Sequence, residues 1–397
     1  MNEEILEHIF KVLDWVLFAV FMLNVVYLLF YSLASRRQVR KMPEVSDRFR
    51  RFAVFIPAYK EDGVIEECVH ACLEQDYPME SYDVIVISDR MESATNDRLR
   101  QLPIRLLEVH FEHSTKAKSL NAAIASLYDS YDIAVVLDAD NVVPYNYLSD
   151  VNAAFEMPSV EVIQTHRIAK NLNNDMALLD AISEEINNSI FRLGHVNVGM
   201  SAALIGSGMA FDYALFKETM SNVKAVGGFD REMELLLLYQ RKRFYYMPET
   251  YVFDEKIQTS SDFSRQRRRW LSAQIHYCQV FGKYFWKAFY SSNWDFCDKM
   301  LQQVLIPRLL LLGFVPACSL LVSLYSWQWG IKWCVLFVLL ATALFVAIPK
   351  RFYTSRLVTA FQKLPYTFWL MFVNVFKLKG ANKTFIHTRH GVVDSNR

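Results

Sequence analysis

Three long runs of uncharged, mostly apolar residues limit what this chain can fold into. They cover residues 15–33, 309–327 and 333–349, and the first two are 19 residues long. An α-helix of that length spans a hydrocarbon core of about 30 Å. Hydrophobic residues make up 53% of the chain, which is high for a protein that is soluble throughout its length. We therefore predict three membrane-spanning helices, the last two joined as a hairpin.

Charged residues around the first run predict its orientation. The residues before it are mainly acidic, whereas residues 36–51 contain seven basic residues against Glu44 and Asp47. Basic residues concentrate on the cytosolic side of membrane helices. The run also lacks the basic start and the small-residue cleavage site of a secretion signal. We expect it to stay attached and the following domain to lie in the cytosol, at the inner or plasma membrane if the protein is bacterial.

The central part of the chain has the pattern of an α/β domain. Short β-branched runs at 52–56, 83–88 and 133–137 alternate with helical patterns at 63–75 and 116–128. Apolar runs of this kind are typical of buried strands in a parallel sheet with helices on its faces. No Gly-x-Gly-x-x-Gly follows a strand and no Gly-x-x-x-x-Gly-Lys-Ser/Thr occurs, which excludes a dinucleotide fingerprint and a P-loop.

Net charge and cysteine spacing exclude further classes. The formal net charge of +1 gives no reason to expect a nucleic-acid partner. The six cysteines are scattered and form no Cys-x-x-Cys pair, so the sequence predicts neither a zinc site nor a disulfide framework.

The chemistry begins at residues 133–141, where an apolar run ends in Asp138 and Asp140. Ligands of open α/β sheets lie at the carboxyl ends of the strands. Two carboxylates at this spacing can share one divalent ion, whose other ligands are often substrate phosphates. Taken alone, the two aspartates fit a solvated polar turn equally well.

Further polar residues follow the same pattern. They are Pro57, Tyr59 and Glu61 after the first strand, Asp89 after the second, Lys116 at the start of a helix, and Gln266, Arg269 and Trp270 before the second apolar region. With these motifs the chain resembles the membrane-embedded family 2 glycosyltransferases, a group that includes cellulose, hyaluronan, chitin-oligosaccharide and poly-N-acetylglucosamine synthases. The resemblance covers residues 52–270 and the arrangement of spans around them.

The resemblance implies a GT-A fold, with a mixed, mostly parallel sheet flanked by helices, that takes a nucleotide-diphosphate sugar, most simply a UDP-sugar. The donor would contact Pro57, Tyr59, Glu61, Asp89, Lys116, Asp138, Gln266, Arg269 and Trp270. Asp140 would hold Mg²⁺ or Mn²⁺, with Asp138 shared between ribose and ion. A dication suits a diphosphate leaving group because it neutralises the developing charge. The alternative for residues 265–269 is a basic patch at the membrane surface.

A base and an acceptor loop complete the implied site. The family has an acidic pair before a helix, and the matching residues 227–235 depart from it. Alignment on Leu235 makes Glu232 the catalytic base, with Glu234 and Asp230 as fallbacks. The alternative is a helix start whose acids complement its dipole. Gly206, Ser207 and Gly208, with Trp270, would contact the acceptor, unless this loop is a plain turn.

The predicted domains are a transmembrane helix at 1–35, a cytosolic glycosyltransferase domain at 36–270, and a membrane region at 271–397 with spans at about 304–327 and 331–349. Residues 275–296 read as one interfacial helix. Residues 364–376 are short for a span and have basic flanks, so we favour an interfacial helix there as well.

The predicted function is inverting sugar transfer to a growing polysaccharide at the membrane. One alternative is transfer of a single sugar to a lipid-linked acceptor. An alternative of another class is a non-catalytic subunit that binds nucleotide sugar or glycan in an export complex. The expected partners are the donor, the glycan or lipid-linked acceptor and the bilayer, with no nucleic acid, and a homo-oligomer or an export partner would complete a channel.

Overall fold

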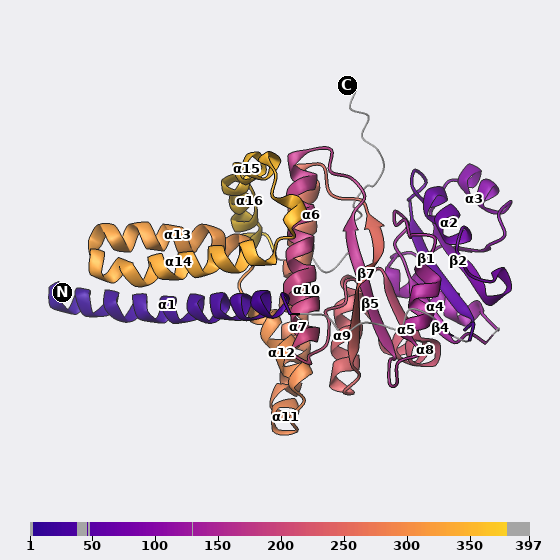
Figure 1. The fold of residues 1–397 in the computed structure, drawn as a ribbon, viewed down its shortest axis with the longest axis horizontal. Helices are drawn as coiled ribbons and strands as arrows, with labels where there is room; N and C mark the ends of the chain where they lie inside the picture. The colour runs from indigo at the N-terminus through magenta and orange to yellow at the C-terminus, as the bar shows by residue number, and fades with distance from the viewer. Residues whose placement is uncertain (1–2, 38–45, 47, 129, 379–397) are drawn as a thin grey trace.

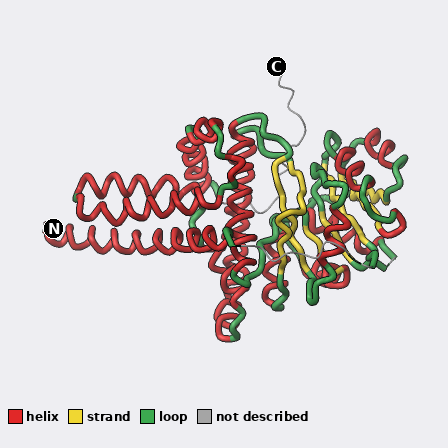
Figure 2. Tube along the Cα trace, viewed as in Figure 1, coloured by secondary structure: helices red, strands yellow, loops and turns green. Residues whose placement is uncertain are grey.

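The computed structural model describes residues 3–37, 46, 48–128 and 130–378, and its parts follow one another along the longest axis (Figure 1). The long helices α1 (Glu3–Ala34), α13 (Arg308–Tyr325) and α14 (Trp327–Ala347) occupy one end. Helices α6 (Asp175–Asn187), α10 (Ser260–Phe281) and α12 (Trp294–Val304) cross the middle of the molecule. All strands lie at the other end (Figure 2).

Seven strands form one sheet in the order β3-β2-β1-β4-β6-β5-β7. Their bounds are β1 Phe52–Tyr59, β2 Tyr82–Asp89, β3 Arg105–Val109, β4 Ile133–Val136, β5 Val162–Ala169, β6 Met209–Asp212 and β7 Phe244–Asp254. All pairings are parallel except those of β6, which runs antiparallel to β4 and β5. The predicted mixed, mostly parallel sheet is therefore confirmed.

The sheet is buried on both faces, which explains its continuous apolar strands. Phe55 of β1 packs in a cluster with Leu120 of α4 and Phe216 of α8, on one face. Its neighbour Ile56 packs in a second cluster with Val69 of α2, on the other. The remaining helices of the domain are α2 Ile65–Leu73, η1 Met79–Ser81, α3 Ser93–Leu99, α4 Lys116–Ser126, α5 Tyr147–Ala154, η2 Asn188–Gly194, α7 His195–Asn197, α8 Tyr213–Asn222 and α9 Phe229–Tyr239.

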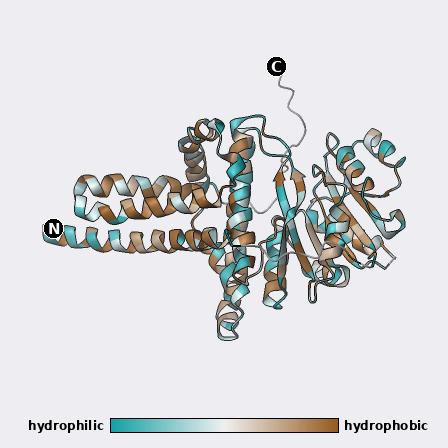
Figure 3. Ribbon diagram, in the orientation of Figure 1, coloured by the Kyte–Doolittle hydropathy of each residue, from teal (hydrophilic) through white to brown (hydrophobic). Residues whose placement is uncertain are grey.

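Helices α1, α13 and α14 are long and apolar enough to cross a membrane, and hydrophobic residues dominate them (Figure 3). The rings of Phe21 and Trp333 meet edge-on at 5.8 Å, and Asp14 accepts a hydrogen bond of 2.7 Å from Trp333 Nε1. The hairpin turn is tighter than the apolar runs predict, because α14 already begins at Trp327. The polar residues between 327 and 333 still form helical backbone hydrogen bonds, so α14 begins before the apolar run at 333–349 does.

The end of α1 is seated on the α/β domain. The ring of Tyr31 stacks on His195 with centroids 3.6 Å apart, and Tyr27 donates a hydrogen bond of 2.9 Å to Asp298 of α12. A Cβ on Gly194, the last residue of the π-helix η2, would lie 2.2 Å from the carbonyl oxygen of Tyr31. The lack of a side chain at Gly194 thus lets the backbones of α1 and η2 touch.

The prediction of one interfacial helix at 275–296 is wrong in its continuity. Helix α10 ends at Phe281, and η3 (Gly282–Tyr284), α11 (Phe285–Tyr290) and α12 follow as separate elements. The break after α11 includes Ser292, whose φ of 57° is left-handed, and Asn293, whose side chain caps α12. Exposed Trp286 and Trp294 still suit an interface between water and lipid.

The last described elements are η4 (Lys350–Phe352), α15 (Ser355–Phe361) and α16 (Leu364–Phe376). Helix α16 has 13 residues and packs against α10 and α13. Its position relative to a bilayer stays a prediction. Much of the basic segment at 36–51 lies outside the described residues, so the predicted orientation of α1 also stays a prediction.

Candidate active site

Three aspartates meet at the carboxyl ends of two strands. Asp138 and Asp140 follow β4, and Asp254 is the last residue of β7. A carboxylate oxygen from each lies within 4.8 Å of the others. Asp254 was not predicted from sequence, although β7 also ends in an acid.

Neighbouring donors hold these like charges together. Asn141 Nδ2 lies 3.3 Å from an oxygen of Asp140 and 3.3 Å from an oxygen of Asp254, and donates to both. Burial raises the pKa of Asp254, but Arg167 and Lys256 outweigh it and keep that pKa below its ordinary value. A charged cluster of oxygen ligands is the donor set that Mg²⁺ and Mn²⁺ prefer, so these residues fit a hard dication.

Lys116 joins this cluster to the loop before β6. Its Nζ forms an ion pair with Asp138 and donates a 2.7 Å hydrogen bond to the carbonyl oxygen of Gly206. Lys116 is the first residue of α4, whose N-cap Thr115 accepts a hydrogen bond from Lys118 N. The helix start therefore fixes the ammonium group between the aspartates and the predicted acceptor loop.

One cavity of about 760 Å³ contains the predicted donor site. Its walls include every predicted donor residue: Pro57, Tyr59, Glu61, Asp89, Lys116, Asp138, Gln266, Arg269 and Trp270. Asp89 is 1% exposed, and neither of its carboxylate oxygens has a hydrogen-bond partner within the described part of the chain. A buried carboxylate without donors is costly, so it suits the hydroxyl or N–H groups of a ligand.

The residues of the predicted acceptor loop differ in their position relative to the cavity. Gly206 lines the cavity, whereas Ser207 and Gly208 are not among the described lining residues. Ser207 is buried and donates to Asn141, beside the aspartates. Gly208 has a φ of +61°, and a Cβ there would lie 2.6 Å from Thr165 Oγ1, so the backbone conformation and the packing both require glycine.

Helix α9 presents its three acids to different surroundings. Glu232 accepts a hydrogen bond of 3.1 Å from Lys224 N and is absent from the described cavity lining. Asp230 and Glu234 do line the cavity. One oxygen of Glu234, Oε1, pairs with Lys299 at 2.6 Å and accepts from Leu204 N at 3.1 Å, whereas its Oε2 is buried without a hydrogen-bond partner within the described chain. Burial raises the pKa of Glu234, and Lys299 opposes that shift.

Asp230 faces the acceptor loop. Its Cγ would lie 3.6 Å from a Cβ placed on Gly206, whose carbonyl oxygen binds Lys116. Asp230 also lies near Arg269: burial lowers the pKa of Arg269, and the charges of Asp230 and Asp138 oppose that shift. Asp230 thus lies beside both Gly206 and Arg269, whereas Lys299 holds the carboxylate of Glu234.

Helix α10 turns Arg267 and Arg269 toward the cavity. Arg267 is buried between the rings of Phe263 and Trp270, at 4.9 and 4.4 Å from their centroids, and pairs with Asp180 at 2.7 Å. Arg269 and Gln266 line the cavity one helical turn apart. Arg265, in contrast, is exposed.

Comparisons with known proteins agree with this geometry. The model of a family described as "Glycosyltransferase like family 2" matches residues 50–273, more than half of the chain. An N-acetylglucosaminyltransferase of Rhizobium meliloti (strain 1021) is 25% identical over a match of 236 residues that covers 55% of this chain and 54% of that protein. The chain thus spans about half the length of this curated relative.

Solved structures share the fold. The mannosyltransferase PcManGT from Pyrobaculum calidifontis, in complex with GDP-Man and Mn²⁺, superposes with a TM-score of 0.54 at 17% identity, over 84% of this chain and 97% of that one. This likeness confirms the predicted GT-A type of fold. S. aureus TarS residues 1–349 with UDP-GlcNAc reach a TM-score of 0.40 at 15% identity, over 87% and 95% of the two chains, and add nothing to the argument.

Proposed function

Because the chain belongs to the glycosyltransferase-like family 2, we propose that it is an inverting glycosyltransferase that transfers a sugar from a nucleotide-diphosphate donor to a glycan hydroxyl at a membrane. One observation carries the proposal: Asp89, the aspartate cluster, Lys116 and Arg269 all face a single cavity. Three helices that are long enough to span a membrane adjoin the same domain. A purely glycan-binding or nucleotide-sugar-binding subunit of an export complex needs no such cluster.

The donor is proposed to be a UDP-sugar, with UDP-N-acetylglucosamine as the first candidate because the curated relative is named for that sugar. Asp89, whose carboxylate oxygens lack partners within the described residues, accepts hydrogen bonds from the ribose or the base. Arg269 can bind a phosphate oxygen pair, and Trp270 offers a ring on which a sugar stacks.

Asp138, Asp140 and Asp254 are proposed to hold Mg²⁺ or Mn²⁺. When bound, the ion neutralises charge on the diphosphate leaving group. Lys116 keeps Asp138 in place through its ion pair, and Asn141 keeps Asp140 beside Asp254. The three carboxylates therefore remain close together before any donor arrives.

Asp230 is the proposed base, in place of the Glu232 that the sequence predicts. The acceptor hydroxyl oxygen attacks the anomeric carbon while its proton passes to Asp230. The bond from that carbon to the diphosphate oxygen breaks, and the nucleotide leaves with the electron pair. One displacement from the opposite face inverts the configuration. The support is positional: Asp230 lines the cavity beside Gly206, whereas Glu232 binds Lys224 N.

Two acceptors remain distinct candidates. Extension of a polysaccharide follows from the resemblance and from Gln266, Arg269 and Trp270 in the cavity wall. Transfer of a single sugar to a lipid-linked acceptor is favoured by the apolar walls where the cavity continues between α13, α14 and α16.

The test is a donor screen on the full chain in detergent. Nucleotide release from a panel of nucleotide sugars is measured with Mn²⁺ or Mg²⁺, and the products are sized. We expect one donor to be used, and Asp140→Asn to abolish its use. Asp97→Asn is the matched control, since Asp97 lies on α3 with a side chain that is 67% exposed. If no donor turns over, or if both variants match the wild type, the chain is not this enzyme.

A further inference from the structure

The cavity that contains the donor site continues into the membrane region. Besides the α/β domain, its walls include Leu312 of α13, Phe337 and Leu344 of α14, and Met371 of α16. Thr367 is the only polar residue that the described parts of α14 and α16 contribute, and its hydroxyl already donates to Leu364 O at 3.0 Å. A bare glycan needs hydrogen-bond partners along its length, whereas a hydrocarbon chain needs none. This arm of the cavity therefore suits a lipid chain.

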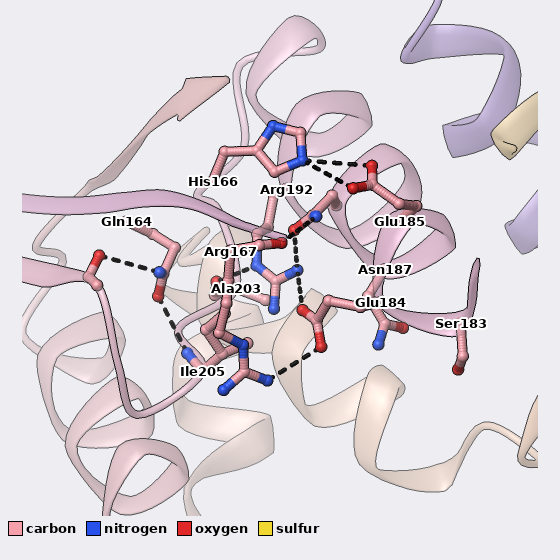
Figure 4. A network of polar contacts seen from close by, with 12 residues as sticks. Gln164, His166, Arg167, Ser183, Glu184, Glu185, Asn187, Arg192, Ala203 and Ile205 are labelled. Carbon is pink, nitrogen blue, oxygen red and sulfur yellow. Dashed lines mark hydrogen bonds and ion pairs between the residues drawn. The ribbon is translucent and has the colours of Figure 1, made fainter. Parts of the chain in front are cut away.

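Helix α6 forms a polar ridge between this arm and the aspartate cluster. Asp180, Ser183, Glu184 and Asn187 lie three or four residues apart and so share one helix face. In Figure 4 the carboxylate of Glu184 lies between Arg167 and Arg192, and its contacts with them measure 3.0 and 3.2 Å. Arg167 in turn lies 3.6 Å from Asp254. The ridge thus links the proposed metal ligands to the start of the membrane helices.

Arg308 stands at the membrane end of this ridge. It is the first residue of α13, and its Nη2 donates to Asn187 Oδ1 at 2.7 Å and to Ser183 O at 3.1 Å. Its other terminal nitrogen, Nη1, is buried without a hydrogen-bond partner within the described chain, and no described carboxylate pairs with Arg308. The hydrogen bonds of this cation within the described chain therefore go to neutral groups.

This wall carries carboxylates as well as cations. Arg167, Arg192 and Lys256 pair with Glu184 and Asp254, and Arg267 pairs with Asp180. Arg308 differs from these four cations because it has no carboxylate partner within the described chain, and a buried charge without a counter-charge is unfavourable unless an anion joins it. Guanidinium groups bind phosphate oxygens through paired N–H groups, so a phosphate is the anion that this wall fits.

We propose that the acceptor glycan is carried on a long-chain lipid phosphate. The phosphate binds Arg308 and Arg267, the hydrocarbon chain lies between α13, α14 and α16, and the glycan extends toward Asp230. The inference rests on the proposed function for its catalytic meaning, since the glycan hydroxyl is the group that attacks the donor. The lipid phosphate site itself is a binding site that can be measured without turnover.

The first measurement is equilibrium binding to the full chain in detergent, with three probes. They are a long-chain isoprenyl phosphate, the matching isoprenyl alcohol and inorganic phosphate. We expect the alcohol to bind at least about tenfold more weakly than the lipid phosphate, because it lacks the charged hydrogen bonds. Inorganic phosphate, which lacks the chain, should not displace the lipid at equal concentration.

Two pairs of variants locate the site. Arg308→Gln should weaken lipid phosphate binding about tenfold or more, whereas Arg356→Gln, an exposed arginine outside the described cavity lining, should not. Leu344→Trp should block the chain, while Val338→Trp, on the exposed side of the same helix, should leave binding intact. Binding of UDP by each variant reports that the domain is folded, and Arg308→Lys should restore part of the affinity.

The inference is overturned if the alcohol binds as well as the phosphate, if Arg308→Gln and Arg356→Gln behave alike, or if no lipid phosphate binds. Its failure is separable from that of the proposed function. Asp140→Asn should keep lipid phosphate binding while it loses sugar transfer. Lipid phosphate binding that depends on Arg308, without any sugar transfer, would contradict the proposed function but not the lipid phosphate site. Sugar transfer to a soluble glycan, without lipid phosphate binding, would contradict the lipid phosphate site but not the proposed function.

Discussion

The two walls of the cavity are built in opposite ways. On the donor side, Asp89, Asp138 and Asp254 stand at or just beyond the carboxyl ends of strands. On the membrane side, Arg267 and Arg308 are carried by helices and held by the polar face of α6. One wall carries negative charge at the edge of a sheet, and the other carries Arg267 and Arg308 on helices that pack against the apolar helices α14 and α16.

The aspartates and the arginines are therefore positioned by different parts of the structure. The aspartates are placed by sheet topology, since the parallel strands β2, β4 and β7 end at the same edge of the sheet although none of them is adjacent to another. Each arginine is instead placed by its own partner: Asp180 pairs with Arg267, and Asn187 accepts a hydrogen bond from Arg308. We therefore expect changes on the donor wall to act on chemistry, and changes on the ridge to act on stability as well.

The largest expected effect lies on the donor wall. Asp140→Asn should lower nucleotide-sugar turnover by roughly 10²–10³-fold, because the charge that would face the dication is lost. A chelator should abolish the wild-type rate, and added Mn²⁺ should restore it. The measurement is nucleotide release against Mn²⁺ concentration, with Asp97→Asn as control. Wild-type activity that survives chelation would show that the aspartates of the donor wall do not act through a dication.

The second prediction concerns the base. Asp230→Asn should reduce turnover by about 10²-fold, the lower end of what general base catalysis contributes. Glu232→Gln should stay within about threefold of the wild type, since it lies outside the reach of a proton transfer. The comparison uses saturating donor and equal amounts of protein that binds UDP. A larger loss of turnover in Glu232→Gln than in Asp230→Asn would instead identify Glu232 as the base.

A third prediction tests the ridge. Glu184→Gln leaves Arg167 and Arg192 without their shared carboxylate, and breaking a buried ion pair costs about 3–5 kcal/mol. The free energy of unfolding should fall accordingly, and urea or thermal unfolding in detergent measures it. Glu218→Gln on the surface of α8 is the control, with an expected change below about 0.5 kcal/mol. Equal stability of the two variants would mean that the ridge does not organise this wall.

The smallest predicted effect is a dependence on pH. Burial raises the pKa of Glu184, but Arg167 and Arg192 outweigh it and hold that pKa well below its ordinary value. A carboxylate with a lowered folded pKa stabilises the fold above its unfolded pKa of about 4.3, and that contribution is lost as the pH falls below it. Between about pH 5 and about pH 3 the wild type should therefore lose more thermal stability than Glu184→Gln. A steeper loss in the variant would contradict this sign.

The donor wall could be predicted from sequence because it depends on local patterns. Apolar runs that end at Asp89 and Asp138 mark strand ends directly, and the parallel sheet brings them together. Asp254 escaped prediction because β7 contains Pro248 and its pairing with β5 shifts register between Thr165 and His166. The strand therefore lacks the continuous apolar run that marks β4.

The base and the ridge required the structure for different reasons. On α9, the choice between Asp230 and Glu232 depends on a rotation of two residues about the helix axis, and an alignment cannot fix it where the motif departs from the family. The ridge joins residues far apart in the chain, such as Asp180 with Arg267 and Asn187 with Arg308. No local pattern signals such pairs.

The contact between Gly194 and Tyr31 has a consequence for the geometry of transfer. Since backbone meets backbone there, α1 cannot slide along η2 without a steric clash. Helix η2 continues directly from α6, which carries the ridge. In the proposed membrane-bound enzyme, the height of the aspartate cluster above the bilayer is thus set by the protein rather than by a flexible tether. The proposed lipid-linked acceptor then has to match that height, so the span from its lipid anchor to its reactive hydroxyl becomes a criterion of selection.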